Sequence, residues 1–383
     1  FRALHAPRLG AWFKRLFSPP EVEPTIAATA SCSEPGDRAQ GWKRLFPFRN
    51  CKDWDILLVI LLAGLAIRVY LSFSFEGHSE SSQTVEYTRL ALGGRLDSTT
   101  PPFYPIFLRA IWGVFGEGNV KAVFMIQGIL NALVIIMMYM IVERLCNRRA
   151  GVIAATLTAV YPNFIIYNLT VLTDSLVVFL VVAFMATACS RLRNGSKALV
   201  ASALAAAGIF LRPTLVCLVP GVLATAKRWR LFLIALILLP VPYVARNVMR
   251  HQAIQPVYSA RTYSLGSNNF TDSRVPYSLI NAMYRNSSAV LAKGWELKDE
   301  QQWDNMQRNS TYAAAYCFTI VMILGLIGLA RFYRKEHEAA VLPILLYIGT
   351  LILFSQFDIR YRVPIEPVFI AYASMLLGGG RCK

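Results

Sequence analysis

Residues 54–73 read WDILLVILLAGLAIRVYLSF, and residues 231–244 read LFLIALILLPVPYV. About 20 consecutive apolar residues cross the hydrocarbon core of a bilayer as a helix. Blocks of this kind recur along the 383 residues, of which 55% are hydrophobic and only 16% are charged. Soluble domains carry about 25% charged residues. We therefore expect an all-α polytopic membrane protein and not a water-soluble globule.

The apolar blocks predict about ten transmembrane helices. Their ranges are 54–75, 120–142, 150–168, 171–189, 198–212, 214–226, 231–246, 312–330, 339–356 and 364–380. The fifth and sixth are short and share the turn Arg212-Pro213, so they are predicted to be broken or re-entrant helices.

The distribution of charge predicts the orientation of these helices. The net charge is +17, which in a soluble protein would suggest a nucleic-acid partner. Here the basic residues lie in short segments between apolar blocks, as the positive-inside rule requires, and anionic lipid explains them better than nucleic acid. Both termini are then cytoplasmic, and loops 76–119 and 247–311 lie on the outer side. The basic residues of the short inner segments are Arg144, Arg148, Arg149, Arg191, Arg193, Lys197, Lys227, Arg228, Arg230, Arg331, Arg334, Lys335, Arg381 and Lys383.

Three parts follow from this topology: a tail (1–53), a transmembrane domain (54–380) and a short C-terminal tail (381–383). The N-terminal tail is basic and is predicted to be largely disordered. It contains WFKRLF at 12–17 and WKRLF at 42–46, whose aromatic and basic residues favour the inner membrane interface. Docking of a partner protein is the alternative interpretation.

The two long loops are predicted to carry short helices. In loop 76–119, Tyr87, Leu90 and Ala91 share one helical face, and 103–115 is an apolar segment that contains Arg109. These helices are expected to lie on the membrane surface. Loop 247–311 is polar and aromatic, and it is expected to end in a soluble helix near 297–310.

Charged residues gather at the predicted outer border of the membrane, where they are costly and usually functional. Arginine beside a carboxylate suits an anionic ligand such as a phosphate, together with proton transfer. The simpler interpretation is that each arginine reaches for lipid headgroups, and that Asp174 caps its helix together with Thr173. The border residues are Asp174, Arg212, Arg246, Asp358, Arg360 and Arg362.

Six motifs, spread over roughly 55–380, resemble those of the GT-C membrane glycosyltransferases. These are relatives of the dolichyl-phosphate-mannose-protein mannosyltransferases and of the bacterial aminoarabinose lipid A transferase. Residues 91–133 are similar to the first outer loop and second helix of that family. The matching residues are Tyr87, four residues before this stretch, and, within it, Ala91, Pro101, Pro102, Tyr104 and Pro105, with the glycine displaced to Gly93 and Gly94. The later matches are Tyr161-Pro162 with Leu172–Leu176, Leu211–Pro213, Ala245–Asn247, Leu265–Asn269 and Arg360–Pro364.

The resemblance implies an inverting transfer of a sugar from a polyprenyl-phosphate donor. The acceptor would be a protein, glycan or lipid on the periplasmic or lumenal face, for example of a bacterial inner membrane. It implies that Arg212, Arg246, Arg360 and Arg362 bind the donor phosphate. It also implies substrate contacts by Tyr87, Tyr104, Asn268, Asn269 and Tyr361, although a simple turn explains the two asparagines equally well. Four histidines and seven cysteines show no metal-ligand pattern, and dependence on a divalent metal stays open.

One position departs from the family pattern. Where the family has its catalytic aspartate, four residues before Tyr87, this chain has Gln83, and a glutamine cannot act as a general base. Either Glu80 or Asp174 has taken over that role, or the chain is an engineered inactive variant, or it is a relative that binds a lipid-linked ligand as a scaffold. A transporter ranks below these, because no inverted repeat is visible and the charges gather at one border.

Overall fold

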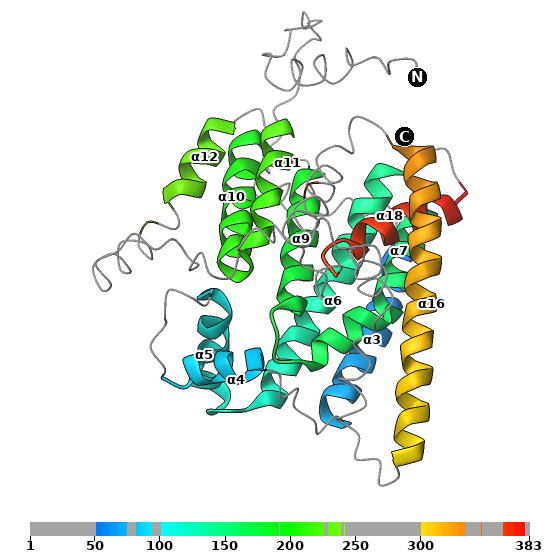
Figure 1. Ribbon diagram of the computed structural model, residues 1–383. Coiled ribbons are helices and arrows are strands. Elements are labelled where there is room, and N and C mark those ends of the chain that lie inside the picture. Colours follow the sequence, from blue (N-terminus) through cyan, green and yellow to red (C-terminus); the bar gives the residue numbers. More distant parts are fainter. Residues whose placement is uncertain are drawn as a thin grey trace, which may run out of the picture. The chain divides into compact units, whose positions relative to one another are not determined.

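The computed structural model describes residues 51–74, 82–93, 101–190, 192–225, 229–238, 241, 300–333, 346 and 363–379. Every regular element in this part of the chain is a helix, as expected (Figure 1). The helices before the second predicted outer loop are α3 (Cys51–Ser74), α4 (Ser82–Ala91), α5 (Phe103–Phe115), α6 (Val120–Leu145), α7 (Arg148–Val160), α8 (Pro162–Ile166), η1 (Tyr167–Leu169), α9 (Asp174–Ala188), α10 (Asn194–Leu211), η2 (Pro213–Cys217), α11 (Leu218–Thr225) and α12 (Trp229–Leu238). The later ones are α16 (Glu300–Phe332) and α18 (Glu366–Leu377).

Most of the described residues in the predicted spans are helical, with exceptions such as Tyr161 and residues 171–173. Among the described residues, three helices are long and apolar enough to cross a membrane, namely Asp55–Ser74 of α3, α6 and α10. A fourth crossing is possible if α7 and the segment Pro162–Leu169, which bend by 48° at their junction, count as one broken span. Apolar helices such as α9 and α18 are shorter. The segment 339–356 lies almost wholly outside the described residues, so the total of ten remains a prediction.

The helix expected near 297–310 is present from Glu300 onward, but it does not end before the predicted span 312–330. Residues 300–332 form one continuous helix, α16, which joins that segment to the predicted span 312–330 (Figure 1). Between 297 and 330 the first glycine is Gly325, and the segment contains no proline. Only Ser310 and Thr311 mark the expected boundary, and such residues lower helix propensity without ending a helix.

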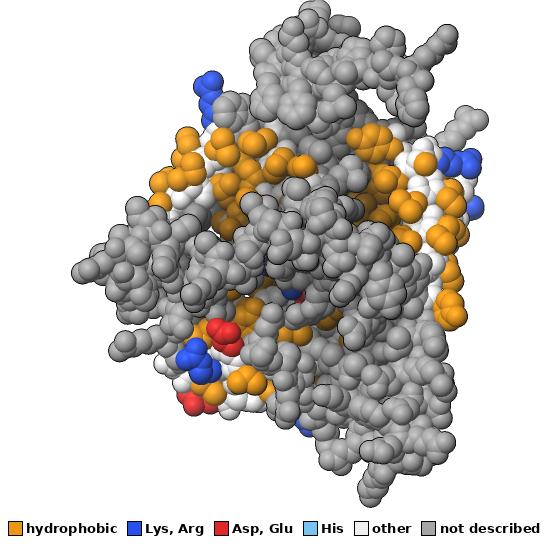
Figure 2. Space-filling view, in the orientation of Figure 1, with side chains coloured by type: hydrophobic (Ala, Val, Ile, Leu, Met, Phe, Trp, Pro, Cys, Tyr) orange, Lys and Arg blue, Asp and Glu red, His pale blue; other side chains and the backbone are white. Residues whose placement is uncertain are grey.

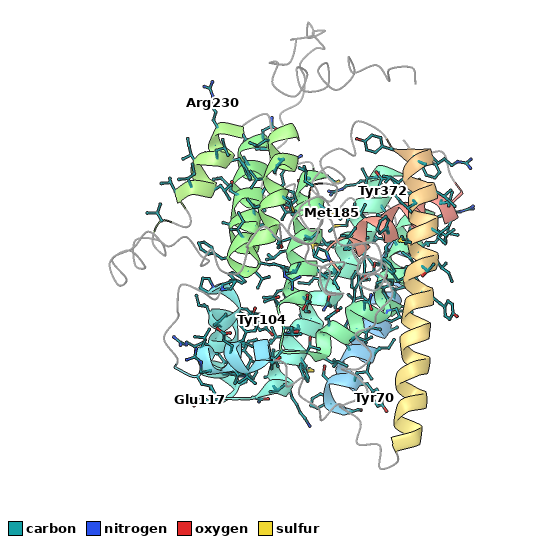
Figure 3. The ribbon with its side chains drawn as sticks, viewed as in Figure 1. Tyr70, Tyr104, Glu117, Met185, Arg230 and Tyr372 are labelled. Atoms are coloured by element: carbon teal, nitrogen blue, oxygen red, sulfur yellow. The ribbon has the colours of Figure 1, made fainter. Side chains whose placement is uncertain are left out.

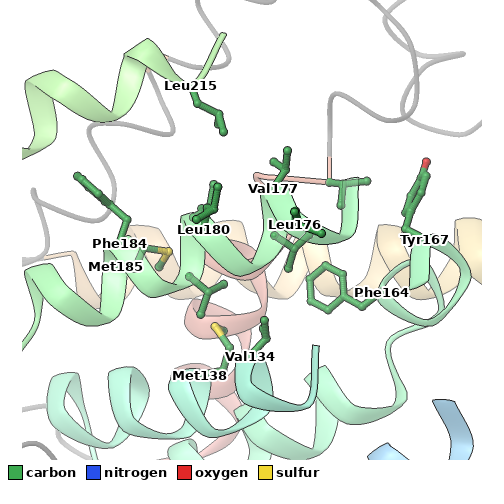
Figure 4. Packing of buried hydrophobic residues seen from close by; sticks show 14 of the residues in the cluster. Val134, Met138, Phe164, Tyr167, Leu176, Val177, Leu180, Phe184, Met185 and Leu215 are labelled. Atoms are coloured by element: carbon green, nitrogen blue, oxygen red, sulfur yellow. The ribbon is translucent and has the colours of Figure 1, made fainter. Parts of the chain in front are cut away.

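Helix α6 lies at the centre of the core and packs against α3, α7, α9 and α18. Figure 4 shows Val134 and Met138 of α6 directed toward α9, which contributes Leu176 and Leu180 to the same cluster. These helices are apolar on both faces and have no polar face that requires contact with water, as is typical of helices buried in a membrane protein.

The outward faces of the peripheral helices are also apolar. Ile234 and Ile237 of α12 are 55% and 65% exposed, and Ile320 of α16 is 57% exposed. Figure 2 shows hydrophobic side chains over the surfaces of both regions. Large exposed apolar patches mark a membrane or protein contact, and here they lie on helices with the composition of spans.

The helices α16 and α18 pack unusually closely. A Cβ atom added to Gly325 would lie 2.8 Å from the Phe369 backbone, and one added to Gly328 would overlap the Tyr372 carbonyl. Small residues permit such close backbone approach between helices in membranes. The pair of glycines therefore fixes α18, whose first residue is Glu366, against α16.

Candidate active site

A buried ion pair joins two residues of the predicted outer border. The Arg212 guanidinium donates from Nη2 to Asp174 Oδ1 at 2.7 Å and to Thr173 Oγ1 at 3.1 Å. Asp174 has no exposed surface, and the Arg212 side chain is 12% exposed. The two residues are 38 positions apart in the sequence, so the contact depends on how α9 packs against α10.

Local sequence explains the direction of Arg212. Pro213 disfavours helical geometry at the preceding residue, and α10 ends at Leu211 with Arg212 in extended backbone at φ −151° and ψ 109°. Asp174 is the first residue of α9, where the helix dipole favours a negative charge. Thr173 precedes it but makes no side-chain capping bond. The capping interpretation of Asp174 with Thr173 therefore gives way to the ion pair.

One oxygen of the Asp174 carboxylate is left over. Oδ1 is bonded to Arg212, whereas Oδ2 is buried and has no hydrogen-bond partner among the described residues. A buried carboxylate oxygen without a donor is costly. Such an atom is suited to accept a proton or a hydrogen bond from a ligand.

The turn that leads to Asp174 is fixed by bonds from other helices. Gln127 Nε2 of α6 donates to the Thr170 carbonyl at 3.3 Å and to the Tyr104 hydroxyl at 3.0 Å. Thr84 Oγ1 of α4 donates to the Val171 carbonyl at 3.4 Å. The first predicted outer loop therefore lies against the segment that presents Asp174.

Tyr104 is buried where the first predicted outer loop packs against the turn before Asp174. It is fully buried (Figure 3). Its ring packs edge-on against Tyr87 with centroids 5.0 Å apart. Burial is the main cause that raises the pKa of the Tyr104 hydroxyl well above its usual range, and the negative charge of Asp174 adds to the effect. Tyr104 is therefore a neutral hydroxyl that accepts a bond from Gln127, and Tyr87, 9% exposed, is its packing partner.

A second layer of buried amides supports the start of α9. Asn131 Nδ2 donates to Ser175 Oγ at 2.6 Å and to Asn168 Oδ1 at 3.3 Å, and Asn168 Nδ2 donates to the Phe124 carbonyl. Sequence reasoning missed both Asn131 and Gln127. The available signal was their spacing, because residues four apart in an apolar helix share one face.

Two further buried charged residues were also given no role. Glu366 Oε1 accepts a bond from Asn163 Nδ2 at 2.7 Å, and both residues are buried. Arg68, 1% exposed, donates to the carbonyls of Gly64 and Ala159 at 2.9 Å each and so joins α3 to the last turn of α7. Polar groups at membrane depth are the signal that points to such residues.

The structure does not describe the side chains of several other predicted site residues. Gln83 belongs to α4, next to Thr84, but its side chain is outside the described part of the structure. Among the described residues, no three His, Cys, Asp or Glu side chains gather as a metal site. The predicted site residues that lie outside the described ranges are Glu80, Arg246, Asn268, Asn269, Arg360, Tyr361 and Arg362.

Comparisons with a protein-family model and with solved structures relate this chain to membrane glycosyltransferases and oligosaccharyltransferases. The family model described as dolichyl-phosphate-mannose-protein mannosyltransferase matches residues 99–248, which include Asp174, Arg212 and Gln127. No curated protein matches this sequence. The structure of ArnT from Cupriavidus metallidurans bound to undecaprenyl phosphate is 12% identical with a TM-score of 0.57, over 86% of this chain and 60% of that one.

The oligosaccharyltransferase of Archaeoglobus fulgidus shares the same fold. Its apo form is 14% identical with a TM-score of 0.54, over 86% of this chain and 50% of that chain. As AglB in complex with an inhibitory peptide and a dolichol-phosphate it is 13% identical with a TM-score of 0.52, over 86% and 50%. The present chain thus spans about half to three fifths of the length of these proteins.

Proposed function

We propose that this chain is a GT-C membrane glycosyltransferase that transfers a sugar from a polyprenyl-phosphate donor to an acceptor on the outer face of the membrane. The family match and the shared fold support the proposal. The observation that carries the proposal is the Arg212–Asp174 pair. It places a guanidinium and a carboxylate with one uncommitted oxygen at the same point, where α10 ends and α9 begins.

The proposed role of Arg212 is to bind the donor phosphate. Its planar fork of donors matches phosphate oxygens, and in the transition state it stabilises the charge that grows on the departing lipid phosphate. ArnT and AglB support this choice of ligand, since their structures hold undecaprenyl phosphate and a dolichol-phosphate. Arg246, Arg360 and Arg362 are proposed to complete the phosphate site.

The proposed reaction is a single displacement that inverts the anomeric carbon. An acceptor oxygen forms a bond to that carbon, and the bond from the carbon to the phosphate oxygen breaks, so that the lipid phosphate leaves with the electron pair. The acceptor proton passes to a carboxylate. Asp174 Oδ2 is one proposed base, because Oδ1 is committed to Arg212. Glu80 is the other.

The outer location is proposed from the connection between α9 and α10. Asp174 begins α9 and Arg212 follows α10, so both lie at the ends of these helices opposite to the link 189–193. That link, with Lys197 just after it, belongs to the predicted cytoplasmic segments. The donor site then faces the periplasm or lumen, with both termini of the chain in the cytoplasm.

A second candidate function is that of an inactive relative that binds a lipid-linked ligand. Gln83 favours this candidate, because an amide cannot act as a general base. The adjacent Thr84 donates a hydrogen bond to the carbonyl of Val171, three residues before Asp174. Position 83 therefore belongs to the segment that contacts the turn before Asp174, and it carries an amide where the family has a base. An engineered inactive chain would show the same feature.

The test compares four forms of the full chain, purified in lipid, with a panel of radiolabelled polyprenyl-phosphate sugars. Donor turnover is measured with and without acceptor for the parent chain, Gln83→Asp, Asp174→Asn and the control Glu117→Gln, which changes an exposed carboxylate. Turnover by the parent and by Glu117→Gln that is lost in Asp174→Asn supports transfer with Asp174 as the base. Turnover by the parent that survives in Asp174→Asn moves that role to Glu80.

The remaining outcomes favour the second candidate or neither. Turnover that appears only in Gln83→Asp identifies a disarmed transferase. Donor binding without turnover in any form supports the role of an inactive binding protein. Absence of both binding and turnover overturns the proposal.

A further inference from the structure

Gln127 is a buried amide in the apolar helix α6 that connects three parts of the site. It has no exposed surface, and its Nε2 group uses both hydrogens on acceptors from other elements, the Tyr104 hydroxyl of α5 and the Thr170 carbonyl. Burying an amide costs free energy unless its hydrogen bonds are made. A leucine or methionine at this place would avoid that cost, so the amide needs an explanation.

We propose that Gln127 and Tyr104 are positioning residues that hold the turn 170–173 and, through it, set the geometry of Asp174 and Arg212 for catalysis. The inference rests on the proposed function of that pair. It assigns Tyr104 a role behind the site and not a contact with substrate, because its ring and hydroxyl are fully buried.

The first step of the argument is that the turn is held from outside. Its carbonyls at Thr170 and Val171 accept bonds from Gln127 of α6 and Thr84 of α4. Within the segment, Thr170 Oγ1 donates back to the Tyr167 carbonyl at 2.9 Å. Two consecutive peptide groups are thus fixed by two different helices, and the direction in which the chain enters α9 depends on them.

The second step is that the turn leads directly to the ion pair. Arg212 bonds to Thr173 Oγ1 and Asp174 Oδ1, which are the last residue of the turn and the first of α9. A shift of the turn moves both acceptors together, and a misplacement of about 1 Å at a reacting centre can cost about 100-fold in rate. The Gln127–Tyr104 bond is therefore placed to control the reaction without contact with substrate.

The third step is that Tyr104 is itself fixed. Its ring packs against Tyr87 of α4 at 5.0 Å and is stacked with Phe107 at 5.9 Å. The hydroxyl that accepts from Gln127 is therefore presented by a rigid ring, and it aligns the amide toward Thr170. Loss of either partner leaves the other without its designated bond.

The experiment uses the full chain in lipid with Gln127→Leu, Tyr104→Phe and the double variant. The matched control is Ser202→Ala, which removes a different buried bond between helices, from Ser202 Oγ to the Phe232 carbonyl at 3.1 Å. Three quantities are measured: kcat for donor turnover, donor KM, and hydrogen exchange of backbone amides in the peptide that spans 168–177. Amide exchange reports local opening of a segment.

The expected result is faster exchange at 168–177 and a fall in kcat of up to about 100-fold in each single variant, larger than the rise in donor KM. The double variant should lose no more than the worse single variant, because the two residues act as one unit. Ser202→Ala should leave both exchange at 168–177 and kcat unchanged, although its thermal unfolding midpoint falls as much as that of Tyr104→Phe.

Several results would overturn the inference. These are unchanged exchange at 168–177 in Gln127→Leu, unchanged kcat in both single variants, or losses that multiply in the double variant. The exchange measurement needs no substrate, so it tests the pair even when the parent chain shows no turnover. That last outcome counts against the proposed function instead.

Discussion

At the scale of single residues, the most informative feature is that Arg212 and Asp174 neutralise each other in a site with almost no exposed surface. Removing one partner of a buried pair leaves the other charge without compensation, which is strongly destabilising. Variants that keep the charge and change the geometry are therefore better probes of function than alanine variants. Arg212 offers such a probe, because lysine retains the charge but lacks the planar fork.

We predict that Arg212→Lys folds and still pairs with Asp174 but binds the donor less tightly. One ammonium cannot serve Thr173, Asp174 and a phosphate in the way that a guanidinium does. Loss of one charge-assisted hydrogen bond, about 1.5–3 kcal/mol, corresponds to a rise in the dissociation constant of about tenfold or more. Binding of a polyprenyl phosphate to the protein in nanodiscs measures it. An unchanged constant would argue against a phosphate role for Arg212.

At the scale of helices, close packing depends on residues with little or no side chain. Gly64 of α3 lies so near α6 that an added Cβ would be 2.8 Å from Ile135 Cδ1, and Arg68 one turn later binds the carbonyl of Ala159. In the same way, Gly325 and Gly328 allow α16 to lie against α18. These contacts set the positions of the helices whose ends carry the site.

We predict that Gly328→Leu separates α16 from α18 and lowers the thermal unfolding midpoint of the detergent-purified protein by several degrees. A leucine at this position would overlap the Tyr372 backbone, which cannot move without the helix. Overpacking of this kind costs about 1–3 kcal/mol or more. Leu326→Ala on the same helix, where the side chain is 49% exposed, serves as the control and should leave the midpoint nearly unchanged. Equal midpoints for both variants would contradict the close contact.

At the scale of the whole molecule, two charged residues that can report the orientation lie at opposite ends of the helices. Figure 3 shows Arg230 at one end of the helices and Glu117 and Tyr70 at the opposite end. Helix α16 ends, with Arg331 in its last turn, at the same end as Arg230 (Figure 1). The proposed topology places the end with Arg230 and Arg331 in the cytoplasm, as the positive-inside rule predicts.

We predict that a cysteine introduced as Glu117→Cys reacts with a membrane-impermeant maleimide added to intact cells, and that Arg230→Cys reacts only after the membrane is opened. Both positions are exposed, so access depends on the side of the membrane alone. The parent chain gives the background from its own cysteines. The reverse pattern would place Asp174 and Arg212 on the cytoplasmic side and contradict the proposed topology.

The amino-acid sequence by itself determined where the helices lie. Apolar blocks and the proline after Arg212 act over a few residues, so the C-terminal end of α10 was predicted from local preferences. The bend at Tyr161-Pro162 was not predicted, because 150–168 was expected to be one span. Local preference also explains why no boundary lies before the predicted span 312–330, because Ser310 and Thr311 are too weak to end α16. Asp174 and Arg212 were predicted to lie at the same border of the membrane for a similar reason. The positive-inside rule uses only the basic residues close to the ends of the apolar blocks, which are local features of the sequence.

Only the tertiary structure decided which side chains meet. Gln127 is 23 residues from Tyr104 and 43 from Thr170, and Asn163 is 203 residues from Glu366. Hydrogen bonds across such separations are set by the packing of whole helices, which no local pattern encodes. The same packing makes Tyr104 a buried partner of Gln127, because burial is a property of the assembled core and not of the residue.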